Sequence, residues 1–229
     1  MLLFIGIALL CARLGFWQVE RLRDRNAANA AVAEARLSPP VDLTTAERVT
    51  DLRTGRAVAG RGTYDFEHEV VVMGRVLGGT PGVHVLTPLR LEGSDRAVLV
   101  NRGFVPAPDA FSVELDSLRE PGPVGVTGVV QPFAPTGDRS PPSRRTGPIA
   151  VGRVHYGSLR DLFPYPLLPV IVRQDTAAGL PALPQRLPPD PLDEGPHLGY
   201  AIQWFAFASI ALVFAAVFTR RVSSPRSAP

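Results

Sequence analysis

The stretch HLGYAIQWFAFASIALVFAAVF, from His197 to Phe218, decides the fold of this chain. From Leu198 onward it has roughly twenty residues without a charged side chain, about the length that crosses a bilayer as a helix. The only strongly polar side chain within the run is Gln203. A helix places residues three, four and seven apart on one face, so one stripe can face a partner helix or a flat ligand. That stripe consists of His197, Tyr200, Ala201 and Trp204, continued by the small residues Ala208 and Ala211 or Ala215.

Two interpretations of the start of this stretch remain open. Tyr200 and Trp204 are typical of side chains that anchor a helix end at the membrane interface, and a single histidine at a helix start is commonly solvated. Alternatively, His197 is a haem or metal ligand, because an ionisable residue near the membrane is often functional.

A second apolar run opens the chain. Residues 1–17 are apolar except for Arg13, whose charge would cost about 2.5–3.5 kcal/mol at the centre of a membrane. Arg13 lies near the end of the run, from which its side chain can extend to the interface. The run lacks the basic start and the small-residue cleavage site of a signal peptide. We therefore expect a first membrane span, short enough to leave open a start upstream of Met1.

Composition favours one globular domain with membrane segments. The chain has 229 residues, of which 45% are hydrophobic and 20% charged, and its formal net charge is +3. Its 24 basic residues are all arginines. They are scattered along the chain, so we expect no nucleic-acid partner. Because Cys11 is the only cysteine, the chain can form neither an internal disulfide nor the two-cysteine motif that attaches haem covalently.

The region between the two apolar runs is predicted to be rich in strands. The first helix is expected to continue over residues 18–36, which are good helix formers, and to end before two prolines. Strands, separated by turn residues, are expected over residues 58–64, 69–76, 83–91, 96–105, 124–130 and 168–172. Short helices are expected over 109–118 and 158–163, and loops over 132–147 and 177–196. This pattern indicates an α+β domain with a mostly antiparallel sheet or a partly open barrel.

Two short motifs have both a structural and a functional interpretation. Trp17 and Arg21 are four residues apart and share a helix face, where an aromatic belt with a basic flank is the plain interpretation. Asn101, Arg102 and Gly103 follow an apolar strand, where they indicate a bulge or a turn. The plain interpretation of Arg102 is a pairing with a nearby carboxylate.

Two further strand patterns have structural interpretations. Residues 82–89, GVHVLTPL, are predicted to form an edge strand because Pro88 cannot donate a backbone hydrogen bond. Asp65, Glu67 and Glu69 alternate along one strand face, which is typical of a solvated face.

Four motifs, taken in order, make the chain resemble the surfeit locus protein 1 family of cytochrome c oxidase assembly factors. They are G-x-W-Q-x-x-R at residues 15–21, G-x-H-V-x-T-P-L at 82–89, V-N-R-G-aromatic-V-P at 100–106 and H-L-x-Y-A-x-Q-W at 197–204. The resemblance covers nearly the whole chain and includes its two spans around one domain. Residues 141–161 depart from the family pattern, in which we would expect an asparagine and a tryptophan.

The resemblance implies a role in delivering or inserting haem a into the catalytic subunit of the oxidase. Because the sequence shows no catalytic site, we expect no enzymatic activity. It implies a transient haem a contact at the membrane histidine, here His197. The matching positions that would complete the site are Tyr200, Gln203, Trp204, Trp17, Gln18 and Arg21, while Asn101, Arg102 and Gly103 form a partner-binding or structural motif. The implied partners are the oxidase catalytic subunit, haem a synthase or other assembly factors, and the lipid bilayer.

This resemblance suggests a mechanism. Neutral imidazole is a good iron ligand, so His197 would bind haem iron transiently. Tyr200 and Trp204 would pack against the porphyrin, and Arg21 or Arg102 would pair with a propionate.

The charge rule for orientation gives conflicting indications. Arginines after the second span place the C-terminus in the cytoplasm, whereas those after the first span place the central domain there. The family implies that the domain lies outside, so we expect a multi-pass protein of the bacterial plasma (inner) membrane with both termini cytoplasmic. The expected segments are a first transmembrane helix at 1–18, a helical extension at 19–37, an extracytoplasmic β-rich domain at 38–196, a second transmembrane helix at 197–219 and a cytoplasmic tail at 220–229.

Two other functions are alternatives to haem delivery. A haem-free scaffold would dock onto oxidase helices through the small-residue stripe of the second span. A membrane-anchored enzyme is disfavoured, because His68, His84 and His155 show no metal-ligand spacing and the sequence has neither a nucleophile elbow nor a phosphate loop.

Overall fold

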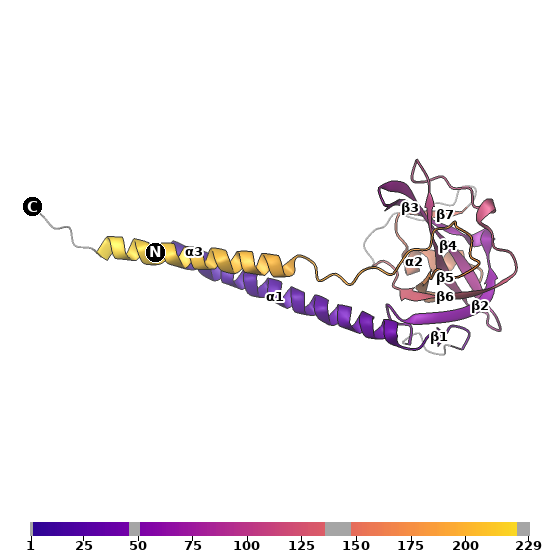
Figure 1. Cartoon of the computed structure of the whole chain (residues 1–229), viewed down its shortest axis with the longest axis horizontal. Coiled ribbons are helices and arrows are strands. Elements are labelled where there is room, and N and C mark those ends of the chain that lie inside the picture. Colours follow the sequence, from indigo (N-terminus) through magenta and orange to yellow (C-terminus); the bar gives the residue numbers. More distant parts are fainter. Residues whose placement is uncertain (1, 46–50, 136–147, 224–229) are drawn as a thin grey trace, which may run out of the picture. The chain divides into compact units, whose positions relative to one another are not determined.

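The computed structural model describes residues 2–45, 51–135 and 148–223. The chain divides into two compact units, one formed by Met1–Ala31 with Pro191–Pro229 and the other by Val32–Asp190. Two long helices dominate the first unit, and a β-rich domain forms the second (Figure 1).

Helix α3 (His197–Ser223) and the part of α1 (Leu2–Leu37) up to Ala31 lie side by side in the first unit (Figure 1). Each buries one narrow stripe of mostly small residues, which allows two helix backbones to approach closely. On α1 the buried residues are Ala8, Cys11, Gly15 and Gln18, and on α3 they include Ala201, Ala208, Ala211 and Ala215. The alanine part of the predicted stripe is thus confirmed as a helix contact.

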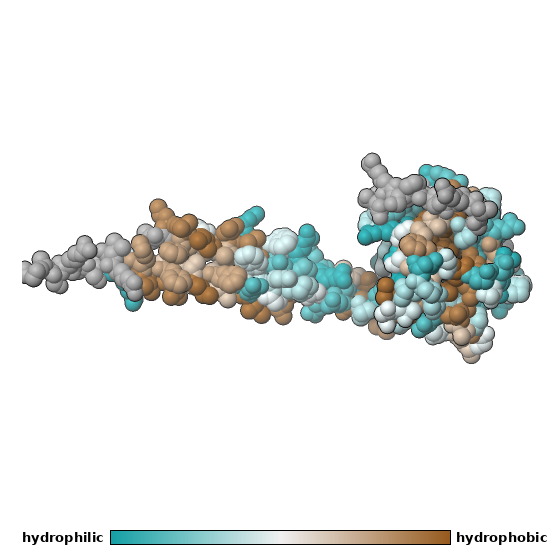
Figure 2. All heavy atoms as spheres, turned by 90° about the horizontal axis from the view of Figure 1, so that it is seen from above, coloured by the Kyte–Doolittle hydropathy of each residue, from teal (hydrophilic) through white to brown (hydrophobic). Residues whose placement is uncertain are grey.

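Both helices are long and apolar enough to cross a membrane. Only 22% of the residues in each apolar window are buried within the protein, in contrast to the core helix of a soluble domain. Figure 2 shows the resulting band of hydrophobic side chains on the surface of the helix pair. Such a surface suggests membrane association.

The second unit is built around one eight-stranded sheet with the order β1-β2-β6-β8-β5-β4-β3-β7. An additional pairing of β2 with β4 closes β2, β6, β8, β5 and β4 into a ring. The strands are β1 (Val41–Asp42), β2 (Ala57–Tyr64), β3 (Val70–Leu77), β4 (Thr80–Leu91), β5 (Ala97–Pro106), β6 (Pro123–Gln131), β7 (Ile149–Val151) and β8 (Leu167–Gln174). Strand β5 is buried on both faces and lies at the centre of the domain.

The sheet is mixed, which corrects the expectation of a mostly antiparallel sheet. Parallel pairing occurs between β1 and β2, between β3 and β7, and between β5 and β8. The reason is that β7 and β8 join the sheet beside strands that are not their neighbours in sequence, and that a long connection, instead of a hairpin turn, separates β1 from β2. Ring closure requires close backbone contact at Gly62 on β2, where an added Cβ would lie 2.1 Å from the carbonyl oxygen of Arg90.

Strand β4 is not the edge strand that Pro88 predicts. It pairs with β5 on one side, and on the other with β3 through residues 80–86 and then with β2 through residues 89–91. Pro88 falls in the gap between these two partners, where its missing N–H costs no ladder hydrogen bond.

The smaller elements depart further from expectation. Residues 109–118 form only the 3-10 turn η3 (Asp116–Leu118), and the helix expected at 158–163 begins earlier, as α2 (Tyr156–Leu159) followed by η4 (Arg160–Leu162). Residues 66–68 form the turn η2 (Phe66–His68), so β3 begins at Val70. Residues 136–147, part of an expected loop and of the segment that departs from the family pattern, lie outside the described residues.

Candidate functional site

The helix unit brings together two residues that are far apart in the sequence. His197 is the first residue of α3, and its Nδ1 lies 2.9 Å from the side-chain oxygen Oε1 of Gln18 on α1. Gln18 is 9% exposed and belongs to the stripe that faces α3, whereas His197 is half-buried. A hydrogen-bonded polar pair thus lies at one end of the row of small residues between the two helices.

Hydrogen bonds from α1 also hold the loop that precedes α3. The side chains of Arg25 and Asn29, one helical turn apart, both donate to the carbonyl oxygen of Asp193, each at 3.0 Å. The carboxylate of Asp193 in turn accepts from the N–H of Gly195 at 2.9 Å. These contacts fix the chain just before His197. These hydrogen bonds could not be predicted from the sequence, because a loop carbonyl leaves no pattern in the residues that bind it.

The other predicted site residues lie nearby but do not close around His197. Arg21 places its guanidinium 5.7 Å from the centre of the Trp17 ring on α1, a cation–π contact. Trp17 and Tyr200 are exposed, as is Gln203. Trp204 is half-buried and meets Phe207 edge-to-face at 6.0 Å. The two helices therefore offer several aromatic surfaces beside one fixed imidazole.

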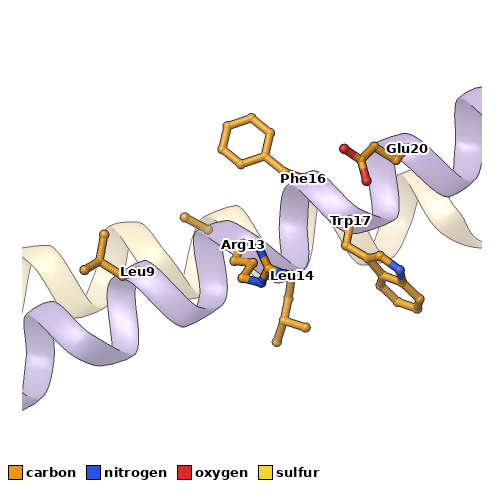
Figure 3. A pocket seen from close by; sticks show the side chains of 7 residues that line it. Leu9, Arg13, Leu14, Phe16, Trp17 and Glu20 are labelled. Carbon is orange, nitrogen blue, oxygen red and sulfur yellow. The ribbon is translucent and has the colours of Figure 1, made fainter.

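A shallow pocket of about 650 Å³ lies along α1. It is lined by Leu9, Ala12, Arg13, Leu14, Phe16, Trp17 and Glu20. Figure 3 shows Trp17 and Leu14 extending on one side of this helix and Phe16 and Glu20 on the other. Of the predicted site residues, Trp17 lines this pocket, while His197 and Gln18 do not.

The β domain holds a second polar group of predicted residues. Val85 on β4 pairs with Gly103, and Leu86 pairs with Asn101, so Arg102 is the extra residue of a β-bulge. The predicted bulge is therefore confirmed. Gly103 has a φ of 126°, and a Cβ there would lie 2.1 Å from the carbonyl oxygen of Gln185, so only glycine fits.

The bulge directs Arg102 into the domain, where it is 0% exposed and surrounded by partners. It donates to Glu120 at 2.7 Å and to the carbonyl oxygen of Leu118, and it lies 3.5 Å from Glu69. Its guanidinium also lies 5.1 Å from the centre of the Tyr64 ring. Arg102 thus pairs with carboxylates, as its plain interpretation predicts.

The network extends to Arg186, whose guanidinium donates to Glu120 at 2.8 Å. Burial raises the pKa of Glu120, but the hydrogen bonds from Arg102 and Arg186 outweigh it, and the net pKa is below its usual range. Burial raises the pKa of Glu69, although Thr87 donates to its carboxylate at 2.7 Å.

Two expectations are corrected by this network. Glu69 is 1% exposed, so the alternating acids do not share a solvated face. Because η2 interrupts the chain at residues 66–68, strand alternation does not apply there. Arg102 is enclosed by protein groups and is not available to pair with a propionate, which leaves Arg21 for that role.

One further cluster contains a histidine. Asp65 accepts from Tyr165 at 2.7 Å and lies 2.8 Å from Nδ1 of His68. Burial raises the pKa of Asp65, but these hydrogen bonds outweigh it and the pKa is lowered overall. Among the described residues, no group of three or more His, Cys, Asp or Glu side chains is arranged to hold a metal ion.

Comparison with known proteins places the chain in a family. The model of the SURF1 family matches residues 5–209. A SURF1-like protein from Monosiga brevicollis is 29% identical, over 93% of this chain and 85% of that protein. Surfeit locus protein 1 of Xenopus tropicalis is 26% identical over 92% of this chain and 73% of its own length, and that of Mus musculus is 27% identical over 53% and 46%. Because the family model spans most of its length, the chain belongs to the SURF1 family, whose members are known in general as cytochrome oxidase assembly factors and not as enzymes.

Proposed function

We propose that this protein assists the assembly of a haem–copper cytochrome c oxidase by holding haem a transiently at His197 and delivering it to the catalytic subunit. The observation that carries the proposal is the fixed imidazole, held by Gln18 at 2.9 Å at the start of an apolar helix. Membership of the SURF1 family supports the oxidase as the client.

The residues present fit a haem cargo. A neutral imidazole with one ring nitrogen engaged by protein keeps the other for iron. Tyr200 and Trp204 follow His197 on α3 and offer aromatic rings to a flat macrocycle. Arg21, whose guanidinium lies beside Trp17, is a cation for a propionate. A single axial ligand of this kind would permit release, as delivery requires.

We also propose a subcellular location and a membrane topology for the protein. The two apolar helices would span the plasma (inner) membrane of a bacterium, with the β domain on the outer side and both termini in the cytoplasm. Within that membrane, haem a synthase or another assembly factor would supply the cargo and the oxidase catalytic subunit would receive it.

The test is the haem content of the oxidase in cells from which this gene is deleted. We expect membranes of the deletion strain to contain less haem a per oxidase, the wild-type gene to restore it, and His197→Ala to restore it poorly. The matched control is Leu198→Ala, which alters an exposed neighbour on the same helix. Full haem a loading without the protein, or with His197→Ala, would contradict the proposal.

A haem-free scaffold is the second candidate. Its support is the exposed apolar surface of α3 outside the alanine stripe, which offers contacts to helices of another membrane protein. This surface includes Ile202, Phe207, Ile210, Val213 and Phe214. Co-purification of oxidase subunits with a protein that never contains haem would favour this function.

A further inference from the structure

We propose that Gln18 is a positioning residue for His197: its side-chain oxygen holds the imidazole proton on Nδ1 and so presents Nε2 to the iron of the cargo. The identity of the cargo rests on the proposed function. The position of the proton on the imidazole ring does not rest on the proposed function, and it can be measured in the protein without haem.

One ring nitrogen of His197 meets the side-chain oxygen of Gln18. Nδ1 of His197 lies 2.9 Å from Oε1 of Gln18. An amide oxygen only accepts hydrogen bonds, and a neutral imidazole has one N–H donor and one nitrogen with a lone pair. The proton of His197 therefore belongs on Nδ1, and the lone pair is on Nε2. Histidines that bind metals commonly have this arrangement, in which the other ring nitrogen donates to a protein oxygen.

The acceptor is held in place by its surroundings. Gln18 is buried on the face of α1 that packs against α3. The loop before His197 is fastened to the same helix through Arg25 and Asn29, which both donate to the carbonyl oxygen of Asp193. The residue that carries the amide and the loop that leads to the ring are thus both held against α1 or within its contact face.

A glycine lies beside the opposite edge of the ring. Gly195 has a φ of 72°, and a Cβ at that position would lie 3.4 Å from Cδ2 and 3.6 Å from Nε2 of His197. Within the described part of the chain, Gln18 is the one hydrogen-bond partner of this ring. Nε2 is therefore the nitrogen that remains for a ligand.

The first experiment uses the full chain in detergent, labelled with nitrogen-15 at histidine and made in cells without haem a. The ring signals of His197 are assigned by their loss in His197→Ala. We expect a protonated Nδ1 and an unprotonated Nε2 in the wild type. A proton on Nε2 of the wild-type ring would overturn the proposal.

Three variants separate positioning from packing. Gln18→Leu removes the acceptor, and we expect the proton to move to Nε2. Gln18→Glu keeps an acceptor at the same place and should keep the proton on Nδ1. The matched control is Asn26→Leu, which alters an exposed amide on α1 and should leave the ring unchanged. A purely structural role for Gln18 would change stability in Gln18→Leu without moving the proton, and that result would also overturn the proposal.

The second experiment adds haem a to the same proteins. Loss of a group that orients a metal ligand typically weakens metal binding about 10–100-fold, which is the change expected for Gln18→Leu. Gln18→Glu should bind haem a and lower its midpoint potential, because a carboxylate makes the imidazole more electron-rich. Equal haem binding by the wild type and Gln18→Leu would refute the positioning role and leave the proposed function standing. A wild type that binds no haem a would refute the cargo, while the nitrogen-15 result would still decide how the ring is held.

Discussion

The charge of Arg102 is wholly buried in the β domain, and its partners are carboxylates. Removing one partner from such a group leaves uncompensated charge inside the protein, which typically costs about 3–5 kcal/mol. We therefore expect Arg102→Met to lower the free energy of unfolding of the domain by about this amount. Hydrogen exchange of β5 in the full chain should show it, because each 1.4 kcal/mol corresponds to about a tenfold change in the opening equilibrium.

Arg119 provides the matched control for this prediction. It forms an exposed ion pair with Asp116 at 2.7 Å, and its side chain is 52% exposed. An exposed pair contributes about 0–1 kcal/mol, so Arg119→Met should change exchange little. Similar effects of the two substitutions would show that the buried network does not stabilise the domain.

His84 on β4 gives the β domain a dependence on pH. Burial and the nearby Arg75 lower the pKa of His84 from 6.5 to about 4. Between these two values the unfolded chain binds a proton that the folded chain does not, so the stability is fully present above pH 6.5 and is lost as the pH falls toward about 4. The unfolding midpoint of the full chain should therefore fall on acidification from about pH 7.5 to about pH 5, and fall less in His84→Gln. An equal fall in both proteins would remove His84 as the cause.

Among the elements, the packing of α1 against α3 requires a glycine at position 15. A Cβ at Gly15 would lie 2.8 Å from the ring of Phe205, whereas a Cβ at Gly6 of the same helix meets nothing within 4 Å. Overpacking of this kind costs about 1–3 kcal/mol. Gly15→Leu should therefore lower the unfolding midpoint of the protein in detergent, and Gly6→Leu should not. Equal midpoints would show that α1 and α3 do not pack through this position.

Six strands were predictable because each is a run of apolar or β-branched residues bounded by turns. Strands β1 and β7 have two and three residues, too few to show a period. Both join the sheet by parallel pairing, β1 with the next strand β2 and β7 with the distant β3. The place of Pro88 could not be predicted either. Whether a proline interrupts a ladder depends on where two neighbouring strands end, and the sequence of β4 does not contain this information.

The candidate site, like the fold, could be predicted only in part from the sequence. Gln18 and His197 are 179 residues apart in the sequence. Of the sequence features, only the family resemblance indicates that both belong to the site. The bulge at Arg102 was predictable from its glycine. The burial of Glu69 was not, because a carboxylate on a strand is buried only when a distant cation meets it. The roles of Arg25 and Asn29 in holding the loop before α3 could not be predicted, since their partner is a backbone carbonyl.

The proposed orientation of the whole molecule in the membrane predicts which engineered cysteines are accessible from outside the cell. Asp95 is exposed at the turn between β4 and β5, in the domain that the proposed function places outside. In a Cys11→Ala background, Asp95→Cys should react with a membrane-impermeant thiol reagent in intact cells. Ser227→Cys, beyond the second apolar helix, should react only after permeabilisation. The reverse pattern would place the β domain in the cytoplasm.

The central claim is that His197 holds the haem cargo. Its most direct test is the visible spectrum of the protein purified from cells that make haem a, recorded beside His197→Ala and Leu198→Ala. We expect a haem a spectrum for the wild type and for Leu198→Ala, and its loss in His197→Ala. Haem a retained in full by His197→Ala, or absent from the wild type, would contradict it.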